Sequence, residues 1–338
     1  MMQAYSSNLM QRFLRSIFIV LFLIPIVGMS LVWFFMIGPH SNEPGASFNT
    51  GNNAIWLEHT WVEDFHTSAD LNLLGRTLVE HDITTIYLHS GPFDEDGTIS
   101  PTRYAEAENF LTFMHEQFSQ LEWQAWLGQI RSEIDLDDEQ VRGEAVESAR
   151  ILVDEIGFDG IHYDIEPIRS GDDGFLNLLK ETRVTLPEVT LSIATDEWQP
   201  DKLSQWVGKL LGIEIVSYWS TKDMENALPY IDQLVVMGYD TSLSDASWYQ
   251  WFLEQQVIYV TNIAKNSPVE VYVGIPAYAT TEATESSHSE AENVENGLLG
   301  VTRGLNNHRS NKDNFGGVAI YLYGEVEDEE WETMETLW

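Results

Sequence analysis

Cysteine is absent from this chain of 338 residues. Without cysteine the protein can form no disulfide, offers no thiol nucleophile and cannot bind zinc through thiolates or carry a lipid on a cysteine. Every function class that depends on thiol chemistry is therefore excluded.

Basic residues are scarce. The chain has 17 Lys and Arg against 54 Asp and Glu, which gives a formal net charge of -37. Such a polyanion repels nucleic acid and anionic lipid headgroups, so we expect no nucleic-acid partner. Neutral or cationic partners fit better, and the 12 Trp and 13 Tyr suit stacking on sugar rings, although many of them will be core residues. A saline habitat would produce the same acidity.

One long uncharged run is present, over residues 16–38, directly after Arg12 and Arg15. A cleavable signal peptide has a shorter apolar region, of roughly 7–15 residues, and a small-residue exit that is not apparent here. The run therefore predicts a membrane-spanning signal anchor, with residues 1–15 as a cytoplasmic tail and the rest outside the cytoplasm. If the segment were cleaved instead, the protein would be secreted.

Eight β-like runs follow a Pro-, Ser-, Asn- and Gly-rich linker at residues 39–53. They cover residues 54–58, 84–89, 123–128, 158–166, 189–194, 233–239, 270–275 and 317–323. Helical patterns lie between them, most clearly at 104–121, 138–156, 175–186 and 248–265. Runs that begin 30 to 47 residues apart fit parallel strands joined by crossover helices. Residues 54–338 are therefore predicted to form a (β/α)8 TIM barrel. A doubly wound open sheet is the alternative, but no glycine-rich phosphate fingerprint follows the first strand.

The fourth run reads FDGIHYDIE and is followed by Pro167. Side chains alternate along a strand, so His162, Asp164 and Glu166 share one face. Three ionisable groups on one face of a buried strand are costly and are usually kept where chemistry needs them. Pro167 cannot donate to a sheet ladder, which ends the strand at Glu166. We therefore predict that Glu166 is a catalytic acid at the mouth of the barrel.

The other strand ends are rich in polar and aromatic residues. These are Trp56, Glu58, His59, His89, Ser90, Trp126, Gln129, Asp196, Glu197, Trp198, Met237, Tyr239, Asp240, Pro276, Tyr278, Tyr321, Tyr323 and Glu325. Because the C-terminal ends of barrel strands carry the active site, this set predicts a sugar-binding cleft. The alternative is that residues near loops are polar in any case. We predict substrate contacts for Trp56, Trp126, Asp240, Tyr278 and Tyr321.

The fourth-strand pattern is similar to D-x-x-D-x-D-x-E, with Asp159, Asp164 and Glu166 in place and His162 where the middle aspartate stands. Three later segments are similar to M-x-Y-D, G-x-P-x-Y and an eighth-strand motif: 237–240, 274–278 and 316–321. With these motifs in this order, residues 54–325 resemble glycoside hydrolase family 18, the chitinases and endo-N-acetylglucosaminidases.

The resemblance implies a retaining, substrate-assisted mechanism without an enzyme nucleophile. Glu166 would protonate the leaving glycosidic oxygen. Asp164 would orient the substrate's N-acetyl group as its carbonyl oxygen attacks the anomeric carbon. Tyr239 would hydrogen-bond that acetamido group, Asp240 would support the site, and Tyr321 would form the floor beneath the sugar.

His162 is the departure from the family pattern. A histidine there can donate a hydrogen bond to Asp164 when neutral, or pair with it as a cation, and so modulate the pKa values of the site. The alternative is a satisfied structural histidine. Asp159 lies on the opposite face of the strand, which favours a structural role.

The expected substrate is an N-acetylhexosamine polymer or oligomer, such as chitin, peptidoglycan or an exopolysaccharide. A non-catalytic glycan-binding barrel and a TIM-barrel glycosidase of another family are the alternatives. The pattern His288-Ser-Glu290 lies in a Ser/Thr/Glu-rich stretch and is interpreted as a solvated loop. No metal or cofactor is expected.

Overall fold

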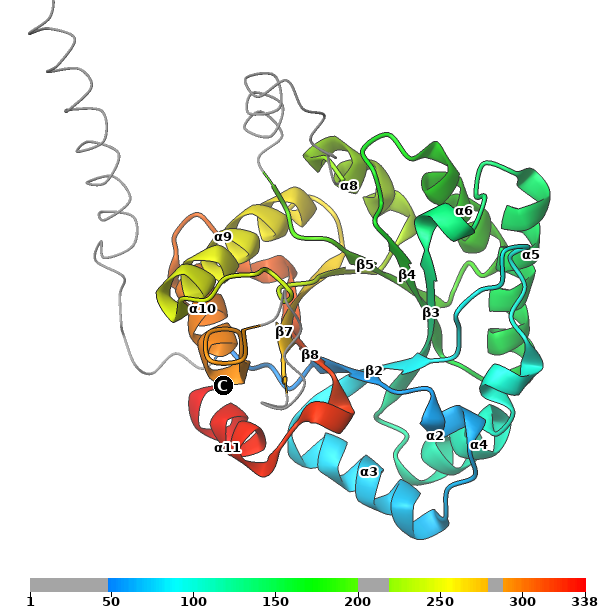
Figure 1. The fold of residues 1–338 in the computed structure, drawn as a ribbon, viewed down its shortest axis with the longest axis horizontal. Coiled ribbons are helices and arrows are strands. Elements are labelled where there is room, and N and C mark those ends of the chain that lie inside the picture. The colour runs from blue at the N-terminus through cyan, green and yellow to red at the C-terminus, as the bar shows by residue number, and fades with distance from the viewer. Residues whose placement is uncertain (1–47, 200–218, 279–287) are drawn as a thin grey trace, which may run out of the picture. The chain divides into compact units, whose positions relative to one another are not determined.

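Eight parallel strands form the centre of the computed structural model, which describes residues 48–199, 219–278 and 288–338. The strands are β1 (Asn53–Leu57), β2 (Ile83–His89), β3 (Glu122–Ile130), β4 (Gly160–Glu166), β5 (Thr190–Thr195), β6 (Gln233–Val236), β7 (Glu270–Pro276) and β8 (Phe315–Tyr321). Each strand pairs with the next, and β8 pairs with β1, so the sheet closes into a barrel (Figure 1). The predicted TIM barrel is confirmed, and each of the eight predicted runs overlaps one of the strands.

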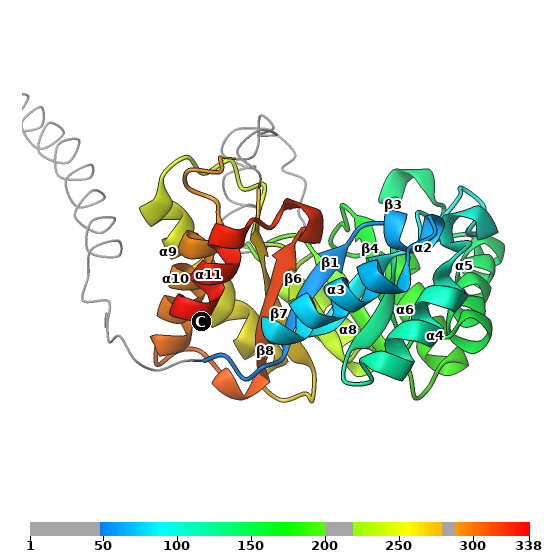
Figure 2. The same ribbon diagram turned by 90° about the horizontal axis from the view of Figure 1, so that it is seen from below.

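Helices surround the barrel (Figures 1 and 2). They are α2 (Thr60–Glu63), α3 (Ser68–Glu80), α4 (Ala107–Gln117), α5 (Glu139–Ile151), α6 (Asp173–Thr185), α8 (Thr221–Ala227), α9 (Ala246–Ala264), α10 (Val294–Asn306) and α11 (Asp328–Leu337). Side-chain caps define several of their starts. Thr67 forms a capping box with Asp70 before α3, and Asp245 accepts the first free N–H groups of α9.

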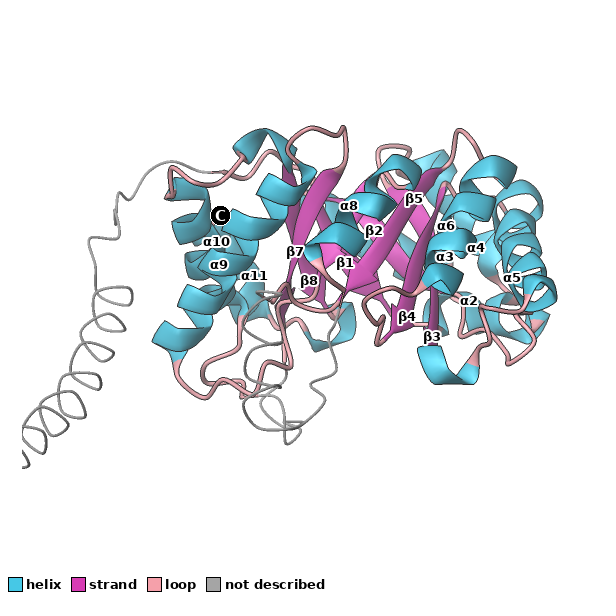
Figure 3. Cartoon of the chain, turned by 90° about the horizontal axis from the view of Figure 1, so that it is seen from above, coloured by secondary structure: helices cyan, strands magenta, loops and turns pink. Residues whose placement is uncertain are grey.

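The alternation of side chains divides the core into two layers. Ile55 and Leu57 of β1 face outward and join the large apolar core between strands and helices, whereas Trp56 faces into the barrel. Figure 3 shows the strands enclosed by the surrounding helices. The inner core consists of Ala54, Trp56, Tyr87, Val235, Tyr272 and Ala319. The same inward parity brings Asp164 and Glu166 to the mouth of the barrel.

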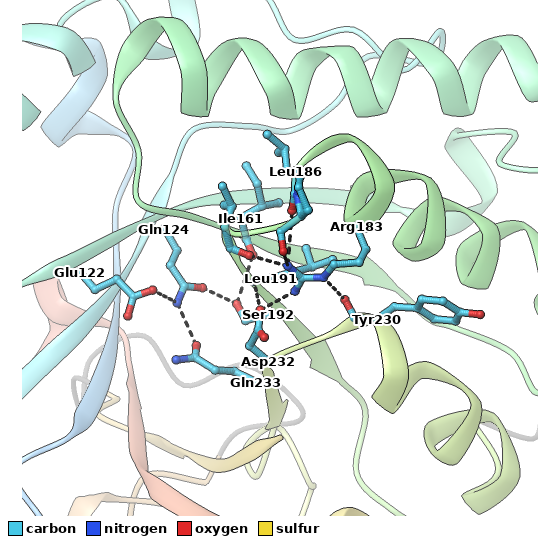
Figure 4. Close-up of polar contacts among 12 residues, drawn as sticks. Glu122, Gln124, Ile161, Arg183, Leu186, Leu191, Ser192, Tyr230, Asp232 and Gln233 are labelled. Atoms are coloured by element: carbon cyan, nitrogen blue, oxygen red, sulfur yellow. Dashed lines mark hydrogen bonds and ion pairs between the residues drawn. The ribbon is translucent and has the colours of Figure 1, made fainter. Parts of the chain in front are cut away.

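A buried polar network lies below this mouth (Figure 4). Ser192 Oγ donates to Gln124 Oε1 at 2.5 Å, and Gln124 Nε2 donates to Gln233 Oε1 at 2.9 Å. Buried amide and hydroxyl groups need such partners, and here they connect strands β3, β5 and β6. Outside the barrel wall, Arg183 of α6 donates to the carbonyl oxygen of Tyr230 and pairs with Asp232 just before β6.

The predicted membrane anchor at residues 16–38 lies outside the described residues. Among the helices of the described ranges, none combines the length and apolar character that a membrane crossing requires.

Candidate active site

Asp164 and Glu166 stand at the C-terminal end of β4, as predicted. The strand ends at Glu166, where Ile130 of β3 is its partner in register. Asp164 Oδ2 accepts a hydrogen bond from Trp126 Nε1 at 2.7 Å. Asp164 Oδ1 and Glu166 Oε1 are buried and have no partner among the N–H and O–H groups of the other described residues. The two carboxyl groups instead share a proton with each other.

The electrostatics assign different protonation states to these two groups. Burial raises the pKa of Glu166, and the charges of Asp164 and Asp196 raise this pKa further. Burial raises the pKa of Asp164 as well, and the hydrogen bonds from the indole N–H of Trp126 and with Glu166 limit this rise. These contacts favour the proton on Glu166 and the negative charge on Asp164, and the two groups titrate as a pair.

Trp126 is a partner of the carboxyl pair. Its indole N–H is used by Asp164, and its ring meets the edge of His89 with centroids 4.6 Å apart at 80°. A contact between Trp126 and substrate stays a prediction.

His162 does not contact Asp164, so the expected hydrogen bond or ion pair between them is wrong. His162 Nε2 lies 3.2 Å from Trp56 Nε1, and His162 Nδ1 lies 2.7 Å from Ser192 Oγ. Indole nitrogen only donates, so Nε2 must accept and Nδ1 carries the proton. Tyr87 stacks on the ring at 3.8 Å. Burial holds the pKa of His162 well below its usual range, so the ring is a neutral member of the core network and not a modulator of Asp164.

Trp56 was predicted to bind substrate, and the structure contradicts this. Its side chain is 0% exposed, because the first strand directs it into the barrel beneath the mouth. The indole packs edge-on against Tyr239 and Tyr321, with centroids 5.9 and 5.7 Å apart. Trp56 therefore packs against Tyr239 and Tyr321 from inside the barrel and supports their rings.

Tyr239 and Tyr321 stack on each other, with ring centroids 4.6 Å apart at an interplanar angle of 18°. Burial raises the pKa of both phenols, and the charge of Asp164 raises both further, so both keep their protons as hydrogen-bond donors. The two rings belong to the loop after β6 and the end of β8, which the barrel brings together beside Asp164. This arrangement is compatible with the roles expected for both residues.

The chain leaves β6 earlier than predicted, at Val236 and not at Tyr239. Gly238 N–H donates to the carbonyl oxygen of Gly274 at 3.1 Å, and this close approach requires glycine, because a Cβ on Gly238 would lie 2.5 Å from the same oxygen. Asp240 follows with a φ of 53°. Its backbone N–H donates to Tyr278 Oη at 2.9 Å, and Tyr278 Oη donates to Asp240 Oδ1 at 3.0 Å. Tyr278 therefore holds Asp240 in place, while substrate contacts of either residue remain predictions.

Asp196, one of the strand-end residues predicted to line the cleft, also acts electrostatically on the catalytic pair. It follows β5, and burial together with the charges of Glu197 and Asp164 raises its pKa to about 7. Its charge also raises the pKa of Glu166. The signal was available in the sequence, because Asp196 has the same inward parity as Ser192 and lies one residue beyond the strand.

Asp159 lies before β4, at the opposite end of the strand from Glu166. Its carboxylate accepts the backbone N–H of Trp123 at 2.8 Å and lies 3.1 Å from His115 Nε2. These contacts agree with the structural role favoured by its parity. Within the described ranges there is no group of three His, Asp or Glu side chains arranged to hold a metal ion.

Comparison with known proteins gives a family match and a fold match. Residues 73–336 match the family model described as glycosyl hydrolases family 18. No curated protein matches the sequence. A family GH18 chitinase from Cycas revoluta in complex with (GlcNAc)3 has a TM-score of 0.59 and 15% identity, covering 84% of this chain and 98% of that chain. The Ostrinia furnacalis Group IV chitinase has a TM-score of 0.57 and 14% identity, covering 85% and 99%. The Bacillus cereus spore cortex-lytic enzyme SleL has a TM-score of 0.57 and 12% identity, covering 85% and 74%. At these identities the likeness is one of fold.

Proposed function

The chain belongs to the glycosyl hydrolases of family 18, and from this membership we propose that it hydrolyses N-acetylglucosamine-containing glycans by substrate-assisted, retaining catalysis. The observation that carries the proposal is the unequal pair at the end of β4. Glu166 holds a proton in a buried site, whereas Asp164 beside it is stabilised as an anion by the indole N–H of Trp126. An acid and an anion two residues apart are what this mechanism needs.

Glu166 is proposed to be the general acid. Its raised pKa keeps it protonated near neutral pH, so it can transfer a proton to the glycosidic oxygen as the bond to the leaving sugar breaks. Glu166 Oε1 accepts no donor from the described residues, so the carboxyl group is available to the substrate. After departure of the leaving group, the same residue would accept a proton from the incoming water.

Asp164 is proposed to act on the acetamido group of the substrate. Once Glu166 donates its proton to the substrate, Asp164 would accept the amide N–H, which orients the acetamido carbonyl oxygen toward the anomeric carbon and stabilises the positive charge that develops during attack. Tyr239, whose raised pKa keeps its proton in place, would donate to the acetamido oxygen, and Tyr321 would support the sugar ring. No enzyme nucleophile is required.

Related proteins support the substrate class. The Cycas revoluta chitinase carries (GlcNAc)3 in its solved structure, and the Bacillus cereus relative is a spore cortex-lytic enzyme. We therefore propose an oligosaccharide or polysaccharide that contains N-acetylglucosamine. A purely glycan-binding barrel is less well supported, because binding alone needs no protonated carboxyl group beside an ionised one.

The proposal is tested by incubating the barrel domain with the N-acetylglucosamine tetramer and following its cleavage and the anomeric form of the first product by proton NMR. We expect cleavage with the β-anomer formed first, and very slow cleavage of the fully deacetylated tetramer. Inversion, or efficient cleavage of the deacetylated oligomer, would contradict substrate assistance.

The location of the protein is a further proposal, based on the sequence. Residues 16–38 would anchor the chain, with Arg12 and Arg15 on the cytoplasmic side and the barrel outside. Protease added to right-side-out vesicles should then remove the barrel domain. Full protection of the barrel, with degradation only after the vesicles are opened, would contradict this topology.

A further inference from the structure

Two buried polar atoms at the mouth of the barrel lack hydrogen-bond partners among the described residues. They are Glu58 Oε2, just after β1, and His89 Nδ1, at the end of β2. Both residues belong to the strand-end set predicted to line the cleft, but neither belongs to the family motif or to the five residues predicted to contact substrate. Unpaired buried polar atoms are unfavourable, and where they gather in a cleft a ligand can supply the missing partners.

These two residues are neighbours across the sheet. Leu57 of β1 pairs with Leu88 of β2, so Glu58 and His89 occupy the next positions on adjacent strands. His89 in turn pairs with Trp126 of β3, whose indole N–H reaches Asp164. The Trp126 ring therefore connects the Glu58–His89 pair to the catalytic carboxyl groups.

Glu58 is held by one oxygen and leaves the other free. Glu58 Oε1 accepts the backbone N–H of Gly324 at 2.6 Å. Gly324 permits this approach, because a Cβ at that position would lie 2.0 Å from the same oxygen. One oxygen of the Glu58 carboxyl group is thus held by the backbone, and the other, Oε2, is left without a partner among the described residues.

His89 is neutral in the working range of pH. Burial, followed by the charges of His59 and Arg103, lowers its pKa to about 4. A neutral imidazole has one donor and one acceptor, which is the capacity of a hydroxyl group. A carboxylate oxygen beside it adds an acceptor. Together they match the hydroxyl groups of a sugar.

We infer that Glu58 and His89 form a binding subsite for hydroxyl groups of an uncharged sugar unit adjacent to the unit cleaved at Glu166. This inference rests on the proposed function. Burial raises the pKa of Glu58, and in its ionised form Glu58 adds a negative charge to that of Asp164, so an acidic sugar, such as a uronic acid or a muramic acid with a free carboxylate, would meet both charges. Arg103, the cation that acts on His89, is already paired with Asp94 at 3.1 Å. The subsite therefore selects neutral over acidic glycans.

The test measures binding without turnover. In the Glu166→Gln background, calorimetry gives the Kd of the N-acetylglucosamine tetramer. Glu58→Gln should raise this Kd roughly tenfold, because a charge-assisted hydrogen bond is replaced by a neutral one. His89→Ala should raise it roughly three- to tenfold. Glu122→Gln is the matched control: Glu122 is also partly buried with a raised pKa, but it begins β3 at the opposite end of the barrel, so the Kd should not change.

A second ligand tests the charge preference. The same tetramer oxidised to carboxylates at C6 should bind more weakly than the neutral tetramer, and Glu58→Gln should recover part of that loss.

Thermal unfolding shows whether the Glu58→Gln and His89→Ala variants are folded, and one folded variant is sufficient to test the subsite. Parent-like affinity for the neutral tetramer in folded Glu58→Gln and His89→Ala would overturn the subsite even where the wild type cleaves this oligomer. Equal affinity for both tetramers would overturn the preference for neutral glycans. Failure of the proposed function gives a different result, in which the wild type neither binds nor cleaves the tetramer.

Discussion

Trp126 donates its indole N–H to Asp164 Oδ2 at 2.7 Å. His162, which stands in the place of the motif's middle aspartate, does not contact this carboxyl group and bonds to Trp56 and Ser192. An indole N–H does not titrate, so it stabilises ionised Asp164 at every working pH. Trp126 is thus a positioning residue for Asp164, the carboxylate proposed to hydrogen-bond the acetamido group of the substrate.

The first prediction concerns this bond. Trp126→Phe keeps an aromatic ring but removes the N–H donor, so Asp164 should have a higher pKa and a less defined orientation. A hydrogen bond to a charged group contributes about 1.5–3 kcal/mol, so kcat should fall roughly 10- to 100-fold with a smaller change in KM. Steady-state kinetics on the N-acetylglucosamine tetramer provide the measurement.

Trp123 provides the matched control on the same strand. It is fully buried, and its Nε1 has no hydrogen-bond partner among the described residues. Trp123→Phe therefore removes an indole N–H without breaking a described bond and should leave kcat close to wild type. Equal effects of the two substitutions would show that the loss at Trp126 is one of packing.

The second prediction concerns the acid. Glu166→Gln preserves the size of the side chain but cannot transfer the proton, so turnover should fall by roughly 10²–10⁴-fold. Substrate affinity should be largely retained, and the unfolding temperature should not decrease, because the raised pKa already keeps Glu166 uncharged and the amide replaces one neutral group by another. Turnover like that of the wild type would exclude Glu166 as the general acid.

The barrel could be predicted because each strand is short, apolar and regularly spaced, and because alternation determines which side chains face inward. The end of β6 could not be predicted in the same way. The run continues to Tyr239 in apolar residues, but the strand ends at Val236, and Gly238 then approaches the backbone of Gly274 more closely than a residue with a Cβ could. Such a contact joins distant segments and leaves no pattern in the local sequence.

The alternation of side chains along β4 also led to the wrong prediction that His162 contacts Asp164. His162 and Asp164 share a face, but two residues along a strand rise by about 6.6 Å, so they lie in different layers of the barrel. The partners of His162 are Trp56, Tyr87 and Ser192, in its own layer on other strands. Parity predicts the face of a side chain, and only the register between strands gives its neighbours.

The third prediction concerns Asp196 and pH. Its charge raises the pKa of Glu166, so Asp196→Asn should allow Glu166 to ionise at lower pH. The alkaline limb of kcat/KM should therefore move to lower pH, as measured from about pH 5 to about pH 10. Asp154→Asn, at an exposed ion pair of η3 (Leu152–Ile156) with Arg150, should leave the profile unchanged. An unmoved limb in Asp196→Asn would show that the two carboxyl groups do not interact.

The fourth prediction uses the same residue to test stability. The pKa of Asp196 rises from 3.8 to about 7 on folding, so its protonated form favours the folded state. This contribution is complete below the ordinary pKa and is lost as the pH rises through about 7. Asp196→Asn should therefore raise the unfolding temperature more at about pH 8 than at about pH 5. Equal shifts at both pH values would contradict the raised pKa.

The last prediction concerns His162. Because its Nε2 accepts from Trp56 and its Nδ1 donates to Ser192, the ring is neutral and lies apart from Asp164. His162→Asn is shorter and cannot keep both bonds at full length, so the free energy of unfolding should fall by about 1–3 kcal/mol. The pH profile of kcat/KM should nevertheless match that of the wild type, because no ionisation of His162 enters the reaction.

His162→Asp, which restores the family aspartate, would bury a carboxyl group whose folded pKa is raised by the same surroundings. Its loss of stability should therefore grow as the pH rises, whereas the loss in His162→Asn should be constant above the ordinary histidine pKa of 6.5 and become smaller below it, because burial lowers the pKa of His162 in the folded wild type. A displaced pH profile in His162→Asn would show that the histidine is coupled to the catalytic carboxyl groups after all.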